Sequence, residues 1–128
     1  MSNRFSHKGF TLIELLMVVV LIGILSAIAI PKFAATKNKA SLATVKADLR
    51  GIQVAQEAHY AGWDRYGNQN QLRNRTKFNP SNGNTIVVSG NAKTYTATVT
   101  NSSIADGPKS CTLTYGGNSK NQGKVICS

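Results

Sequence analysis

Carboxylate side chains are scarce in this chain of 128 residues. It contains five Asp and Glu against 15 Lys and Arg, so its formal net charge is +10. From Lys32 to the C-terminus, four of the five carboxylates remain beside 13 of the 15 basic side chains. Calcium sites in proteins need several oxygen ligands, usually from Asp or Glu. The scarcity of carboxylates therefore argues against calcium-binding loops.

Sequence motifs of the common enzyme classes are also missing. The chain has no GxSxG nucleophile elbow, no HExxH zinc motif, no P-loop and no EF-hand pattern. His7 and His59 are its two histidines, and its two cysteines have no histidine nearby in the sequence. Two cysteines without such a partner are weak evidence for zinc. We therefore expect neither an enzyme nor a metal or other cofactor.

Apolar residues make up 41% of the chain but are unevenly distributed. No charged residue lies between Leu15 and Ile30. A chain that is disordered throughout lacks such a run. About 95 residues remain outside it, which is enough for one small domain and too few for a large enzyme core. They are rich in Asn, Gly, Ser, Thr and Lys.

Residues 10–30 have the length of a membrane-spanning helix. As a helix they would extend about 32 Å, close to the hydrocarbon core of about 30 Å. Arg4 and Lys8 precede them and are expected to stay on the cytoplasmic side by the positive-inside rule. A cleaved secretory signal is the alternative. Small residues at 26–29 or 34–35 could supply its cleavage site, although the apolar run is longer than such signals require.

One acidic residue, Glu14, interrupts this apolar run. An ionised carboxylate inside a bilayer costs about 2.5–3.5 kcal/mol on insertion scales. Acids in such segments are candidate functional residues and need a partner. The alternative is that Glu14 lies near the interface and reaches water.

The sequence around Glu14 resembles the N-terminal signature of the type IV pilin and pseudopilin family. The residues that carry the resemblance are Lys8, Gly9, Phe10, Glu14 and Pro31, with about sixteen uncharged residues between the last two. The resemblance is close over residues 1–60 and only architectural beyond them. It implies that residues 1–9 form a leader peptide. A prepilin peptidase would cut after Gly9 and methylate the new amino group of Phe10, both at the cytoplasmic face.

The same resemblance implies a subunit of a helical homo-oligomeric filament. Cleavage would leave an α-amino group on Phe10, cationic near its ordinary pKa of about 7.7–8.0. In a stack of subunits this cation can approach Glu14 of a neighbour, and buried charges are tolerated when they are paired. Such a subunit is anchored in the inner membrane before the pilus assembly machinery builds it into an extracellular pilus. The pilus would serve motility, adhesion or DNA uptake.

Two residues weaken the helix expected here. Gly23 costs about 1 kcal/mol relative to Ala, and Pro31 leaves the carbonyl of Ala27 without its helical partner. In pilins this stretch bends in the subunit and can partly unwind in the filament, so Gly23 and Pro31 are candidate kink or melting positions. A simple kink or a helix end at Pro31 is the alternative. The Ala-rich, Pro-free sequence of residues 32–61 favours continuation.

Hydrophobic spacing predicts one long helix over roughly residues 11–61. Apolar residues recur at spacings of three and four in its second half, namely Leu42, Val45, Leu49, Ile52 and Ala55. The first half is apolar on all sides. The second half is amphipathic and is therefore expected to pack on a small domain.

After a polar loop at residues 67–83, the period of the sequence changes to two. Strands are expected at residues 85–89, 93–100, 110–115 and 124–127. The predicted fold is therefore α+β, a long N-terminal helix packed on an antiparallel sheet of about four strands. The expected division is a leader over 1–9, an apolar helix over 10–36 and a globular domain over 37–128.

Cys111 and Cys127 lie on the last two predicted strands. An exported domain experiences an oxidising compartment, and a disulfide closing this loop would contribute roughly 3 kcal/mol in the chain-entropy account. In the pilin family such a pair encloses a variable loop that faces outward. We therefore expect a disulfide, with two buried thiols as the alternative.

Basic residues cluster directly after the long helix. Arg73, Arg75 and Lys77 alternate over five positions, and such a cluster can attract polyanions such as DNA through phosphate contacts. The alternative is an ordinary solvated surface. The leading hypothesis is a major-pilin-like structural subunit. A minor competence pilin that binds DNA through this surface and a pseudopilin of a type II secretion system are the other two.

Overall fold

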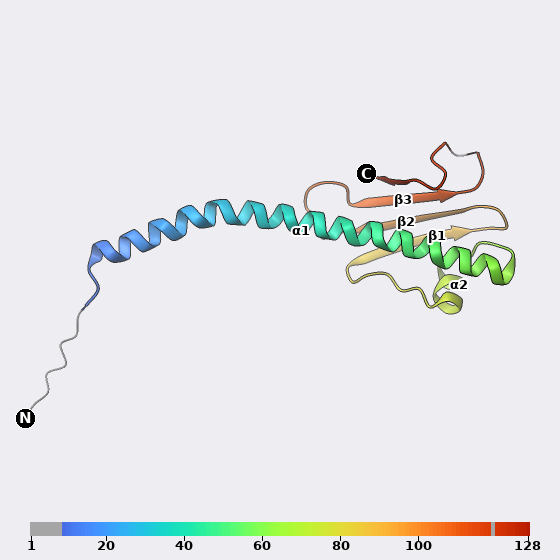
Figure 1. Cartoon of the computed structure of the whole chain (residues 1–128), viewed down its shortest axis with the longest axis horizontal. Helices are drawn as coiled ribbons and strands as arrows, with labels where there is room; N and C mark the ends of the chain where they lie inside the picture. Colours follow the sequence, from blue (N-terminus) through green and yellow to red (C-terminus); the bar gives the residue numbers. More distant parts are fainter. Residues whose placement is uncertain (1–8, 119) are drawn as a thin grey trace, which may run out of the picture. The chain divides into compact units, whose positions relative to one another are not determined.

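The computed structural model describes residues 9–118 and 120–128 (Figure 1). Its elements, in chain order, are α1 (Leu12–Trp63), α2 (Gln69–Gln71), the π-helical turn η1 (Leu72–Thr76), β1 (Asn84–Gly90), β2 (Tyr95–Asn101), β3 (Ser110–Tyr115) and β4 (Val125–Cys127). This confirms the α+β fold. The chain divides into two units, Met1–Ala34 and Ala35–Ser128.

Helix α1 runs through Pro31 without a break in its assignment. A proline inside a helix removes one backbone hydrogen bond, and the Ala-rich sequence beyond it has no further proline before the end of α1. The prediction of one continuous helix is confirmed, and the alternative in which the helix ends at Pro31 is excluded. Its bounds differ by one or two residues from the expected 11–61.

Large apolar side chains in the first unit are exposed. From Leu12 to Ile30 each of them is at least half exposed, and Phe33 is 74% exposed. By length and composition, α1 is the one helix among the described residues that could cross a membrane. An apolar surface of this extent marks contact with lipid or with other protein.

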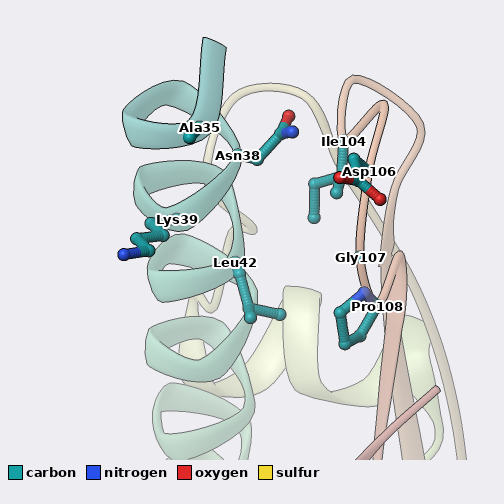
Figure 2. Close-up of a pocket in the computed structure, with 8 residues that line it drawn as sticks. All are labelled: Ala35, Asn38, Lys39, Leu42, Ile104, Asp106, Gly107 and Pro108. Atoms are coloured by element: carbon teal, nitrogen blue, oxygen red, sulfur yellow. The ribbon is translucent and has the colours of Figure 1, made fainter. Parts of the chain in front are cut away.

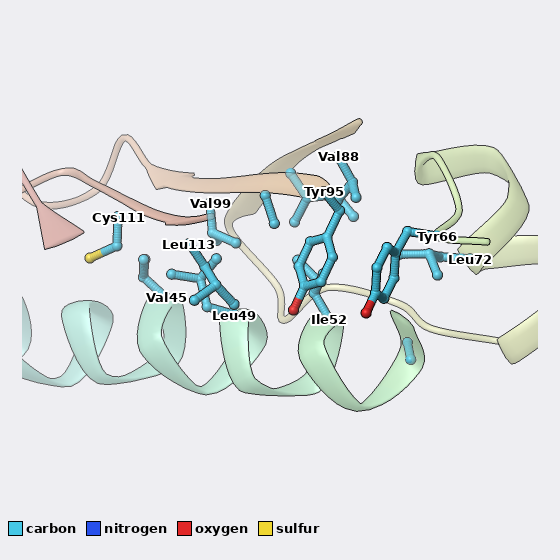
Figure 3. Packing of buried hydrophobic residues seen from close by; sticks show 13 residues of the cluster. Val45, Leu49, Ile52, Tyr66, Leu72, Val88, Tyr95, Val99, Cys111 and Leu113 are labelled. Carbon is cyan, nitrogen blue, oxygen red and sulfur yellow. The ribbon is translucent and has the colours of Figure 1, made fainter. Parts of the chain in front are cut away.

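The second half of α1 buries one stripe. Val45, Leu49 and Ile52 are fully buried and Ala55 is nearly so, while Leu42 packs at the edge of the same cluster. Figure 3 shows Val45, Leu49 and Ile52 extending from the helix toward the inward-facing residues of the strands. The helical spacing therefore predicted the buried face correctly.

The four strands form one antiparallel meander in the order β1-β2-β3-β4. Side chains alternate between the two faces, as the period of two requires. The inward face carries Ile86, Val88, Tyr95, Ala97, Val99, Cys111 and Leu113. The outward face is mostly Thr and Ser, and its hydroxyls pair across strands, as in the 3.1 Å contact of Thr98 with Thr112.

The polar stretch after α1 differs from the expected loop. Asn68 and Gln71 form a reciprocal capping box that begins α2, and η1 follows directly. Leu72 is fully buried. One apolar residue in a polar stretch carries no periodic signal, so the turn that this side chain anchors was not predicted.

A buried carboxylate joins α1 to the segment before β1. Asp48 is 7% exposed. It accepts hydrogen bonds from the backbone N–H of Ser81 at 2.9 Å, from the Ser81 hydroxyl at 2.7 Å and from the Asn84 amide at 2.7 Å. The Asn84 side-chain oxygen in turn accepts from Asn101 on β2. This network crosses more than thirty positions of sequence, and helical spacing gave no sign of it.

All four tyrosines of the chain lie together. The rings of Tyr60 and Tyr66 are 4.8 Å apart, those of Tyr66 and Tyr95 4.9 Å, and Tyr115 lies 5.6 Å from both Tyr66 and Tyr95. Burial raises the pKa of Tyr66 to about 12 and that of Tyr95 to about 12. We call this group the tyrosine cluster. It packs the end of the sheet against the C-terminal part of α1.

A disulfide joins Cys111 to Cys127, as predicted. The two residues are partners in the register of β3 and β4, and Cys111 is fully buried. The three-residue strand β4 is therefore tied covalently to the sheet.

Candidate functional site

The segment before α1 contains the predicted cleavage position. Gly9 and Phe10 have no regular structure and are exposed, Phe10 to 88%. A Cβ atom placed on Gly9 would meet nothing within 4 Å. Neither packing nor a left-handed backbone within the described chain therefore requires glycine at this position.

Glu14 belongs to a capping box at the start of α1. Its Oε2 accepts hydrogen bonds from the backbone N–H of Thr11 at 2.9 Å and from the Thr11 hydroxyl at 2.8 Å. The hydroxyl oxygen of Thr11 in turn accepts from the backbone N–H of Glu14 at 3.3 Å. Donors at a helix N-terminus lack helical partners, and this arrangement satisfies two of them.

This box was not predicted, although its signal is present in the sequence. Thr-x-x-Glu directly before an apolar run is a recognised N-terminal signature of helices. Glu14 thus has a local role in addition to the one expected between subunits. Its negative charge also lies at the positive end of the helix dipole, which is favourable.

Apolar side chains surround Glu14. An open groove of about 480 Å³ is lined by Ile13, Glu14, Leu16, Met17, Val20 and Leu21. Rows of side chains on one helix leave grooves that accept the rows of another. The arrangement can therefore hold a carboxylate within an apolar surface suited to a neighbouring helix.

The two helix-weakening residues lie farther along the same unit. A Cβ on Gly23 would meet nothing within 4 Å, and Pro31 lies inside α1. The single chain therefore gives no packing reason for glycine at position 23. Bending or melting at these positions stays a prediction.

The predicted basic cluster lies on η1 and its end. Arg73, Arg75 and Lys77 are all exposed, and Lys77 adopts a left-handed backbone with φ 57°. The guanidinium carbon of Arg75 lies 4.3 Å from the centre of the Trp63 ring, and its Nη1 lies 3.4 Å from Nε2 of His59. The structure thus brings α1 residues to the cluster that the sequence analysis had left out.

A smaller pocket of about 260 Å³ lies in the second unit, between α1 and the loop from β2 to β3 (Figure 2). Asn38, Leu42, Ile104, Asp106 and Pro108 are among its lining residues. The Asn38 side-chain oxygen accepts from the backbone N–H of Ala105 at 3.2 Å, so it serves to hold the loop. Within residues 9–118 and 120–128, no three His, Cys, Asp or Glu side chains gather as metal ligands would.

Comparison with known proteins bears on the N-terminal segment first. Residues 4–30 match the prokaryotic N-terminal methylation motif. The type IV wide pilus major component PilA4 of Thermus thermophilus is 38% identical over 90 residues, which are 69% of this chain and 69% of the relative. The type IV major pilin protein PilA of Myxococcus xanthus is 40% identical over 84 residues, which are 64% of this chain and 37% of the relative.

A secretion protein is also similar. The type II secretion system core protein G of Pseudomonas aeruginosa is 38% identical over 53 residues, which are 41% of this chain and 37% of the relative. The chain therefore spans little more than a third of the length of the Myxococcus and Pseudomonas relatives, whereas it spans two thirds of the Thermus protein. Together with the methylation motif and the long apolar helix packed on a four-stranded sheet, this similarity shows that the chain belongs to the type IV pilin and pseudopilin family.

Proposed function

We propose that the chain is a structural subunit of a type IV pilus and polymerises through the first half of α1. The observation that carries this proposal is the apolar surface from Leu12 to Ile30, which is exposed on all sides of one helix. Water does not stabilise such a surface, so it needs lipid before assembly and neighbouring helices afterwards. The similarity to major pilus components of two bacteria supports the same function.

Processing precedes assembly in this proposal. A prepilin peptidase cuts after Gly9 and methylates the amino group of Phe10. The exposed, irregular backbone at these residues supports cleavage there, because a protease needs an extended and accessible segment. The lack of any packing need for glycine at position 9 supports a requirement set by the peptidase.

Glu14 then pairs with the Phe10 amino group of a neighbouring subunit and sets the axial register. An unpaired carboxylate in an apolar helix bundle is costly, and pairing with a cation offsets that cost. The groove of apolar side chains around Glu14 supports a helix as the neighbour. The hydrogen bonds from Thr11 hold the carboxylate at the helix start, where the new amino group of the next subunit can reach it.

Three variants separate the charge of Glu14 from its capping role. Glu14→Gln keeps a side chain that can complete a capping box but removes the charge. Thr11→Ala removes the cap, at a cost of about 0.5–2 kcal/mol, and keeps the charge. Glu57→Gln is the matched control, because Glu57 is the only other glutamate and is exposed on the same helix.

Each variant is expressed in a bacterium that has a pilus assembly system and lacks its own major pilin. We expect Glu14→Gln to reach the membrane at the normal level and to reduce surface filaments at least tenfold by electron microscopy. Thr11→Ala and Glu57→Gln should keep filaments within about twofold. Normal filament numbers with Glu14→Gln would refute the register role, and a mature N-terminus other than Phe10 would refute the processing step.

A second candidate is a subunit of a type II secretion pseudopilus, which the similarity to core protein G supports. The two functions differ in the machinery that accepts the subunit. Restored secretion in a strain that lacks core protein G, without surface filaments in the pilin-deficient strain, would favour this candidate.

A further inference from the structure

The end of α1 and the turn η1 are fastened together around one histidine. His59 is fully buried. Its Nδ1 lies 2.8 Å from the carbonyl oxygen of Arg65 and must donate to it, so Nε2 is free to accept from Nη1 of Arg75 at 3.4 Å. The His59 ring also stacks on Trp63 at 4.8 Å. Three segments of chain therefore meet at this side chain.

Arg75 is held in place without losing its charge. Its guanidinium lies 4.3 Å over the Trp63 ring, which is a cation–π contact, and the residue is still exposed. Trp63 itself is 47% exposed. Holding a cation in one position before binding removes part of the entropy cost that a free surface side chain pays on binding.

Two more basic residues belong to the same turn and its end. Arg73 and Lys77 lie two residues before and two residues after Arg75, and both are exposed. Within the described part of the chain, neither has a hydrogen bond or ion pair that would neutralise it. Their charges therefore remain available to an anionic partner.

We propose that Trp63, Arg73, Arg75 and Lys77 form a binding site for the phosphate backbone of duplex DNA. We call it the Trp63–Arg75 site. Exposed Arg and Lys side chains can neutralise phosphates, and each phosphate neutralised releases condensed counterions. Trp63 contributes to the site by holding the Arg75 guanidinium in place. Contacts to phosphate position a protein on DNA and do not select a sequence.

The biological consequence rests on the proposed function. A filament repeats the Trp63–Arg75 site once per subunit, so one duplex can contact several sites at the same time. Linked weak contacts of this kind can raise the overall affinity by about 10²–10⁴ without any new contact. The filament would thus bind DNA much more tightly than a single subunit does.

The test uses the full chain in micelles of an uncharged detergent and a short, labelled DNA duplex of arbitrary sequence. Anisotropy gives the affinity across a series of salt concentrations. Trp63 is the only tryptophan of the chain, so its fluorescence reports directly on this site. We expect binding that weakens steeply with salt, that is accompanied by a change in Trp63 fluorescence, and that is independent of DNA sequence.

Two triple variants that each remove three positive charges distinguish a specific binding site from general electrostatic attraction to DNA. Changing Arg73, Arg75 and Lys77 together to Gln should reduce the magnitude of the log–log salt slope by about 2.7, at roughly 0.9 per phosphate. Changing Lys109, Lys120 and Lys124 together to Gln removes the same charge from the loops beside β3. The second triple variant should change the slope by less than one.

Arg75→Lys gives a second test, because it keeps the charge and loses the planar stack on Trp63. We expect about threefold weaker binding and a shifted Trp63 emission in the absence of DNA. Equal effects of the two triple variants, wild-type binding by Arg75→Lys, or binding without a Trp63 signal would each overturn the site.

Equally tight binding of a sulfated polysaccharide, with the same dependence on these residues, would overturn its assignment to DNA. Filament formation is scored separately by microscopy. Normal filaments made of subunits that do not bind DNA would refute the Trp63–Arg75 site and leave the proposed function standing.

Discussion

Replacing Tyr95 by Phe should stabilise the protein. Tyr95 is 1% exposed and belongs to the tyrosine cluster, and its hydroxyl has no hydrogen-bond partner among the described residues. Figure 3 shows the ring extending from β2 toward α1, among apolar side chains. Folding therefore removes this hydroxyl from water without returning a hydrogen bond.

The expected magnitude follows from that lost hydration. Burying an unpaired polar group costs about 1–3 kcal/mol, and deleting one oxygen atom forfeits only a few tenths of a kcal/mol of dispersion contacts. Tyr95→Phe should therefore raise the free energy of unfolding by about 1 kcal/mol. For a domain of this size the midpoint of thermal unfolding should rise by roughly 4–8 °C.

Tyr66→Phe is the matched control. Tyr66 is also buried, but its hydroxyl is not among the buried groups that lack a partner in the described residues, and hydrogen bonding with Tyr115 contributes to its raised pKa. The same atomic deletion should therefore lower the free energy of unfolding by about 1 kcal/mol. Both variants are compared with the wild type by urea unfolding in the same detergent, with the disulfide oxidised.

The structure therefore predicts a higher free energy of unfolding for Tyr95→Phe and a lower one for Tyr66→Phe. A Tyr95→Phe variant that unfolds at lower urea concentration than the wild type would show that the hydroxyl is hydrogen-bonded. The reasoning from burial would then be wrong at this position. Equal changes in the free energy of unfolding of the two variants would likewise refute the reasoning from burial at Tyr95.

Three further predictions concern the second unit. Asp48→Ala leaves three donors without their acceptor and should lower the free energy of unfolding by about 3 kcal/mol, measured by urea unfolding. Gly90→Ala should also destabilise, because its Cβ would lie 2.5 Å from the backbone oxygen of Gly67; an unchanged midpoint would contradict that contact. Burial raises the pKa of Tyr66 and of Tyr95 from 10 to about 12 in the folded state. Stability should therefore be intact below pH 10 and fall between about pH 10 and 12, and absorbance at 295 nm should show these two tyrosines ionising late.

Local patterns in the sequence determined most of the secondary structure. Apolar residues at spacings of three and four identified the buried face of α1 from Val45 to Ala55. Alternation with a period of two identified the strands and their inward faces to within two residues. These patterns were readable because each depends on neighbours within one or two turns of backbone.

The N-terminal signature is a local pattern of the same kind. Lys8, Gly9, Phe10 and Glu14 lie within seven positions, and they indicated the family without any knowledge of the fold. The capping box of Thr11 and Glu14 was equally readable from its spacing.

Only the tertiary structure decided which distant polar and aromatic side chains meet. Asp48 finds its donors 33 and 36 positions away, and Arg75 finds His59 16 positions away. Such pairs carry no period, and their formation depends on how the loops close once the apolar faces of α1 and the sheet have packed. The sequence by itself therefore determined the elements, their buried faces and the family. Tertiary packing decided that Asp48 is satisfied, that Tyr95 is not, and that Arg75 is fixed on Trp63.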